Sequence, residues 1–162
     1  MIKLKILFFQ EDGFLKIAIG SDHGGFFYKE KIKEYLKSKK YEVIDKGTYS
    51  PEPVDYPYFG EEVGKSVQSG EADRGIIICG TGIGISIAAN KIKGVRAALC
   101  TNEFMARMAR SHNDANILAL GQRVIGLDHA LAIIDVFLET PFEGGRHERR
   151  VKLILDIENG II

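Results

Sequence analysis

The stretch Arg74-Gly75-Ile76-Ile77-Ile78-Cys79-Gly80-Thr81-Gly82-Ile83-Gly84 decides the fold class of this 162-residue chain. Its apolar residues are consecutive rather than alternating, which is typical of a strand covered by helices on both faces. Glycines follow at once, and a helix is predicted to open among them. The stretch therefore predicts a strand, a turn and a helix within a parallel α/β sheet.

The same alternation of short β-like runs and helical patterns extends along the chain from Leu15 onward. Strands are predicted at 15–20, 41–47, 74–79, 95–100 and 116–120, and helices at 26–40, 58–69, from the glycines after Cys79, at 103–110, 127–139 and 146–158. We expect a three-layer αβα sandwich with a five-stranded parallel, Rossmann-like sheet and a C-terminal tail helix. One domain should span residues 15–162, and residues 1–14 form an N-terminal extension with no assigned role.

The composition excludes several classes of partner. Lysine plus arginine and aspartate plus glutamate each total 22, and the sequence pI is about 6.9. No overall field attracts nucleic acid or an anionic membrane, so any anion site must be local. We expect no signal peptide and no membrane span. The two cysteines, Cys79 and Cys100, are too few for a disulfide framework, which indicates free thiols and a cytoplasmic protein.

Polar and glycine-rich segments follow the predicted strands, where ligands bind in open parallel sheets. We expect their acidic, basic and cationic groups to lie together along one edge of the sheet. The segments are Gly20–Gly25, Lys46–Thr48, Cys79–Gly84, Thr101–Asn102 with Ser111–Asp114 after the next helix, and Gly121–Arg123.

Three familiar glycine-loop motifs do not match. A dinucleotide fingerprint needs G-x-G-x-x-G after the first strand, whereas that loop reads G-x-x-x-G-G. A P-loop needs a lysine after its last glycine, and none stands there. A cysteine phosphatase of the C-x5-R type needs arginine at the position of Ile85. These spacings favour neither NAD nor nucleotide binding.

A thiol at the start of a helix suits proton abstraction. Exposed amides at a helix N-terminus favour the thiolate, so Cys79 could act as a base or nucleophile near neutral pH. The glycines from 80 to 84 let backbone N–H groups approach a substrate oxygen, which gives an anion hole for an enediolate. The alternative is that Cys79 is a small core residue. That interpretation is the favoured one for Cys100.

Seven separate segments make the chain similar to the ribose-5-phosphate isomerase B family, which includes allose- and galactose-6-phosphate isomerases. The resemblance covers about residues 15–158, and the segments stand in the family's order. The resemblance implies an aldose–ketose isomerase of carbohydrate metabolism that works through a cis-enediol without a metal or cofactor. It also implies a dimer or tetramer with active sites between subunits. The segments are SDHGG (21–25), DKGTYS (45–50), DYP (55–57), ICGTGIGISIAANK (78–91), RAALC (96–100), RSHNDANILALGQRVIG (110–126) and PFEGGRHERR (141–150).

The resemblance assigns catalytic roles to three residues. Cys79 would be the base that moves a proton between C2 and C1, and Thr81 would help transfer protons between O1 and O2. His112 would open the furanose ring by proton transfer to the ring oxygen, which an imidazole can do near neutral pH. Gly80, Gly82, Ile83 and Gly84 would hold the developing enediolate.

The resemblance also supplies the local anion site. Arg123, Arg146 and Arg150 would contact the phosphate, and the last two are four residues apart on one helix face. His23 would bind the phosphate as well, Asp22 would bind sugar hydroxyls, and Asn113 would contact the substrate near the reacting carbons. Arg149 falls outside the matched positions.

Several functions stay open at this stage. D-Ribose 5-phosphate, converted to D-ribulose 5-phosphate in the pentose phosphate pathway, is the favoured substrate, and allose 6-phosphate is the alternative. Galactose 6-phosphate is less favoured, since those family members usually need two different subunits. A non-catalytic sugar-phosphate sensor would need neither Cys79 nor His112. A phosphoacceptor receiver domain would need aspartate in place of Cys79.

Overall fold

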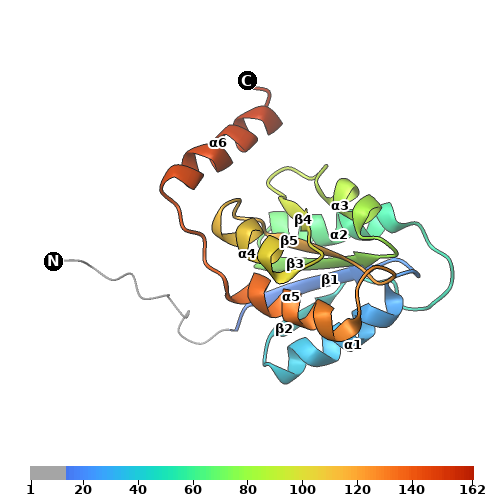
Figure 1. The fold of residues 1–162 in the computed structure, drawn as a ribbon. Helices are drawn as coiled ribbons and strands as arrows, with labels where there is room; N and C mark the ends of the chain where they lie inside the picture. The colour runs from blue at the N-terminus through green and yellow to red at the C-terminus, as the bar shows by residue number, and fades with distance from the viewer. Residues whose placement is uncertain (1–13) are drawn as a thin grey trace.

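The computed structural model describes residues 14–162, and the extension predicted at 1–14 lies, except for Phe14, outside them. Strands and helices alternate along the chain, as predicted (Figure 1). The strands are β1 (Lys16–Ser21), β2 (Glu42–Asp45), β3 (Arg74–Cys79), β4 (Ala97–Leu99) and β5 (Ile117–Gly121). The helices are α1 (Phe26–Ser38), α2 (Tyr56–Gln68), α3 (Ile83–Ala89), α4 (Glu103–Ser111), α5 (Leu127–Glu139) and α6 (Arg146–Glu158).

The five strands form one sheet in the order β2-β1-β3-β5-β4, and every neighbouring pair is parallel. In the register, Ser21 pairs with Ile78 and Cys79 pairs with Gly121. The carboxyl ends of the three central strands therefore lie side by side. This confirms the predicted Rossmann-like α/β class.

Two hydrophobic cores hold the helices on opposite faces of the sheet. Helices α1, α4 and α5 cover one core, which takes Ile76 and Ile78 from β3. Helices α2 and α3 cover the other, which takes Ile77 and Cys79. Because side chains alternate across a strand, one apolar run feeds both cores. The Cys79 side chain consequently points to the α2 and α3 face.

Two predicted boundaries differ from the structure. Helix α2 begins at Tyr56 rather than Tyr58, because Pro57 fits the first turn of a helix, where no N–H bond is needed. The strand predicted over 95–100 is only Ala97–Leu99. The backbone N–H of Arg96 donates to Asn116 Oδ1 (2.8 Å), a side chain rather than a neighbouring strand.

Helix α6 stands apart from the three-layer body at the end of an extended segment (Figure 1). Its first turn is anchored through His147, which is only 5% exposed. Farther along, α6 presents apolar side chains to solvent: Leu153, Ile154 and Ile157, followed by Ile161 and Ile162 after its end. The end of α6 is tied to its own chain by the Gly94 N–H, which donates to Glu158 Oε2 (2.9 Å), but this apolar face stays exposed.

Candidate active site

Cys79 ends β3 and begins a turn that brings backbone N–H groups to its sulfur. The thiol is 5% exposed, and the Gly82 N–H donates to Sγ (N···S 3.1 Å). Gly82 has φ +80°, and a Cβ there would lie 2.6 Å from Leu99 Cδ1 and 2.8 Å from the Leu120 carbonyl carbon. Glycine is required for this close turn. The turn thus packs on β4 and β5 and fixes a thiol beside N–H donors.

Thr81 and Ile83 form the outer surface of the same turn. The Ile83 N–H donates to Thr81 Oγ1 (3.2 Å), and both residues are exposed. A Cβ on Gly84 would lie 2.7 Å from the Tyr56 ring, so the start of α3 packs against the start of α2. The hydroxyl of Thr81 is therefore held near the Cys79 turn, at the solvent side.

The loop after β1 lies against the Cys79 turn. Asp22 is 7% exposed, and its Oδ1 accepts the Gly25 N–H (3.1 Å). A Cβ on Gly24 would lie 3.2 Å from the Gly80 nitrogen, which places the two turns in contact. His23 Nδ1 lies 3.1 Å from the Val54 nitrogen and 3.2 Å from the Val54 carbonyl oxygen, which holds the ring at this edge.

Arg123 adds a cation to this edge. Its backbone N–H donates to the Gly80 carbonyl (3.0 Å), and a Cβ on Gly80 would lie 3.1 Å from Arg123 Nη1. A guanidinium against bare glycine backbone is suited to a phosphate or other oxyanion. Asp22, His23, Cys79 and Arg123 therefore share the carboxyl edge of the sheet, as expected.

His112 and Asn113 do not share that edge, so the expectation of a single edge is wrong for them. Helix α4 returns the chain to the amino edge before β5 begins. Arg96, beside the start of β4, holds this segment by donating from Nε to the Asn113 carbonyl (3.2 Å). The Gly75 N–H, at the start of β3, donates to the Asn116 carbonyl (2.9 Å). Since β5 (Ile117–Gly121) rises about 3.3 Å per residue, its ends are about 13 Å apart.

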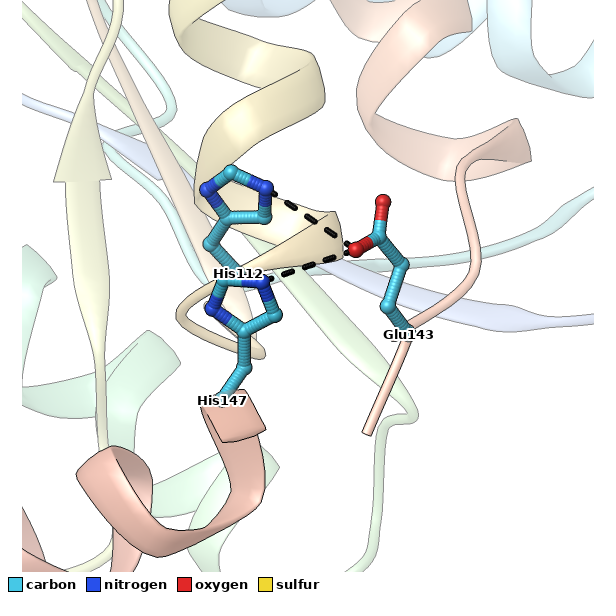
Figure 2. A group of neighbouring side chains, drawn as sticks. All are labelled: His112, Glu143 and His147. Carbon is cyan, nitrogen blue, oxygen red and sulfur yellow. Dashed lines mark ion pairs between the residues drawn. The ribbon is translucent and has the colours of Figure 1, made fainter. Parts of the chain in front are cut away.

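His112 belongs to a second cluster, with Glu143 and His147 (Figure 2). The two imidazole rings stack with centroids 4.0 Å apart and an interplanar angle of 10°. Glu143 Oε2 lies 3.5 Å from His147 Nε2 and 3.9 Å from His112 Nε2. His147 and Glu143 were not among the predicted site residues, although both lie in the PFEGGRHERR segment.

These three side chains are the ones among residues 14–162 grouped closely enough to hold a metal, with ligand atoms within 4.8 Å of one another. The arrangement does not suit a cation. An imidazole lone pair lies in the plane of its ring, and one ion cannot lie in the planes of two stacked rings. Arg146 Nε is also only 3.5 Å from His147 Nε2 and would repel a cation.

Arg146 and Arg150 are exposed on α6 and are not brought to the Cys79 turn by their own chain. Arg146 instead lies beside His147 at the amino edge. The predicted site residues thus fall into two groups. We call the first the thiol half-site (Asp22, His23, Cys79–Gly84 and Arg123) and the second the histidine half-site (His112, Asn113, Arg146 and Arg150).

Cys100 has the character of a core residue. It is 2% exposed, and burial raises the pKa of its thiol to about 11. The Sγ atom is 3.7 Å from the Ala98 carbonyl oxygen. At neutral pH this thiol stays protonated and unreactive.

The comparisons with known proteins bear on both half-sites. A family model described as Ribose/Galactose Isomerase matches residues 17–154. The chain belongs to this isomerase family. The match spans Cys79 and Arg123 as well as His112 and Arg146. No helix within residues 14–162 is long and apolar enough to cross a membrane.

Individual relatives support the same family assignment. Ribose-5-phosphate isomerase B of Escherichia coli K12 is 52% identical over 143 residues, 88% of this chain and 96% of its own. Galactose-6-phosphate isomerase subunit LacB of Clostridium acetobutylicum is 47% identical over 145 residues, 88% of this chain and 84% of its own. The solved structure of Clostridium thermocellum ribose-5-phosphate isomerase B is 61% identical with a TM-score of 0.90, and covers 91% of this chain and 100% of that one. The chain is therefore a sugar-phosphate isomerase, which argues against a non-catalytic sensor.

Proposed function

We propose that this isomerase interconverts D-ribose 5-phosphate and D-ribulose 5-phosphate through a cis-enediolate. The observation that carries the proposal is the Cys79 thiol beside the glycine turn, with the Gly82 N–H 3.1 Å from its sulfur. A base next to N–H donors is what an enediolate intermediate requires. The E. coli and C. thermocellum relatives named as ribose-5-phosphate isomerase B support the choice of substrate.

In this mechanism Cys79 takes the C2 proton of the open-chain aldose and later returns a proton to C1. As the C2–H bond breaks, its electrons form the C1–C2 double bond and the negative charge moves to O1. Backbone N–H groups between Gly80 and Gly84 stabilise that charge, and Thr81 moves a proton between O2 and O1. Nothing is oxidised or reduced overall, so no redox partner or cofactor is needed.

The complete site draws on two copies of the chain. The thiol half-site and the histidine half-site lie at opposite edges of one sheet, so the two cannot act together on one substrate within one chain. In a homo-oligomer, the two half-sites can act on one substrate if the histidine half-site of one copy faces the thiol half-site of another. The exposed apolar side chains of α6 (Leu153, Ile154 and Ile157) support such a contact, since a second copy would bury them. Arg146 and Arg150 would then join Arg123 at the phosphate.

Six-carbon substrates are the second candidate. The LacB relative is 47% identical and is named as a galactose-6-phosphate isomerase subunit. Allose 6-phosphate is the other six-carbon candidate. A five-carbon and a six-carbon substrate differ by one hydroxymethylene unit between the reacting carbons and the phosphate. The depth of a site between two copies therefore decides the preference.

The test is a comparison of isomerisation rates for ribose 5-phosphate, allose 6-phosphate and galactose 6-phosphate at matched enzyme concentration with excess chelator. We expect the largest kcat/KM for ribose 5-phosphate, unchanged by the chelator. A larger kcat/KM for either six-carbon substrate would overturn the substrate assignment and keep the reaction class. Loss of all turnover in chelator would contradict the cofactor-free mechanism.

A further inference from the structure

The ring of His112 is packed against a second, more deeply buried imidazole. The His112 side chain is 35% exposed, whereas that of His147 is 6% exposed. The nearly parallel stack at 4.0 Å covers one face of His112 and leaves its edge accessible (Figure 2). A histidine at the end of a helix would otherwise sample several rotamers. The buried ring therefore restricts the orientation of the exposed one.

Glu143 lies beside this stack, in the segment between α5 and α6. Its backbone N–H donates to the Ser111 carbonyl (3.1 Å), which ties the segment to the end of α4. Its Oε2 faces the Nε2 atoms of both rings, at 3.5 and 3.9 Å. The His147 N–H donates to the Gly144 carbonyl (3.1 Å). The backbone hydrogen bonds of Glu143 and His147 thus hold the segment that carries the buried ring against the end of α4.

The charges around His147 favour a neutral ring. Its pKa is lowered by burial, and also by His112, Arg146 and Arg150, while Glu143 opposes this by raising it. A neutral His147 avoids placing two stacked cations face to face when His112 carries a proton. The exposed ring of His112, rather than the buried ring of His147, is the one that can reach a substrate.

We propose that His147 is a positioning residue for His112, holding that ring by stacking in the orientation that opens the cyclic sugar phosphate. The inference rests on the proposed function. In ring opening, His112 donates a proton to the ring oxygen as the C1–O4 bond breaks. The O1–H bond then supplies the electrons of the C1 carbonyl, and its proton returns to His112 through solvent. A misoriented ring cannot place its N–H on the ring oxygen.

The two directions of the reaction separate this role from a general structural one. Ribose 5-phosphate is mostly a furanose and must be opened on the enzyme. Ribulose 5-phosphate has no hydroxyl placed to close a five-membered ring, so it needs no opening, and its product can leave the enzyme as the open-chain aldose and close in solution. At saturation, His147→Ala should lower kcat with ribose 5-phosphate by at least about tenfold and kcat with ribulose 5-phosphate by less than about threefold.

Two further variants complete the test. His147→Phe keeps an aromatic ring against His112 and should recover most of the lost kcat with ribose 5-phosphate. Arg149→Ala, on the same turn of α6 and exposed, should match wild type in both directions. Equal losses in both directions for His147→Ala, no loss, or no recovery in His147→Phe would overturn the positioning role. A wild type that does not turn over ribose 5-phosphate would instead overturn the proposed function itself.

Discussion

At the scale of single residues, the two cysteines have similar exposure but different surroundings. Cys79 is 5% exposed and accepts a backbone N–H, whereas Cys100 is 2% exposed and has a pKa of about 11. At a given pH near neutrality, a pKa two units above an ordinary thiol leaves about 100-fold less thiolate. Of the two thiols, only that of Cys79 accepts a backbone N–H from within residues 14–162.

Replacing Cys79 tests whether it is the base. Cys79→Ala should lower kcat by at least about 100-fold, since a positioned general base contributes that much or more. Its Kd for ribose 5-phosphate, measured by calorimetry, should stay within about threefold of wild type, because the phosphate ligands are untouched. Cys100→Ala is the matched control and should retain kcat. Activity of Cys79→Ala equal to that of the control would contradict the assignment.

At the scale of elements, the turn between β3 and α3 depends on a left-handed glycine in a crowded place. Gly82 and Gly70 both have φ +80°, but a Cβ on Gly70 would meet nothing within 4 Å. Gly70→Ala should therefore cost only backbone strain, about 1 kcal/mol. Gly82→Ala adds a clash with Leu99 and Leu120 and should cost at least about 2 kcal/mol more. Chemical denaturation measures both, and equal losses would show that crowding is unimportant.

The attachment of α6 through His147 predicts that the stability of the folded chain depends on pH. The pKa of His147 is lowered in the folded chain, so the folded state takes up its proton less readily than the unfolded state. Stability is therefore lost as pH falls below about 6.5, the ordinary histidine value. Between pH 7.5 and 5.5 the unfolding temperature should fall more in wild type than in His147→Phe, which cannot titrate. Parallel curves for the two proteins would contradict this coupling.

Helices and strands were predictable from the sequence where their burial determines which residue types they contain. The consecutive isoleucines of β3 can only be accommodated between two helical layers, so strand and layer follow together. The position of His112 at the amino edge also follows from a parallel sheet, since α4 must return the chain to that edge before β5 begins. The prediction that all site residues share the carboxyl edge did not take this return into account. The contact of His147 with His112 was not predictable, because it depends on the path of the segment between α5 and α6. No periodic pattern encodes that path.

At the scale of the whole molecule, one chain carries two half-sites that face away from each other. The thiol half-site lies at the carboxyl edge and the histidine half-site at the amino edge, with the length of β5 between them. A symmetric pair of chains would hold two composite sites, each with Cys79 from one copy and His112 from the other. In such a pair, α6, which stands apart from the body of its own chain (Figure 1), would pack on the other copy.

The most direct test of this composite site mixes two inactive proteins. Cys79→Ala and His112→Ala are co-expressed with different affinity tags, and the hybrid is purified through both. In a dimer with shared sites, one site of the hybrid holds both substitutions and the other holds neither, so about half of the wild-type activity should return. If Cys79 and His112 instead act within one chain, both sites of the hybrid stay damaged. Activity no greater than that of either variant alone would contradict the composite site.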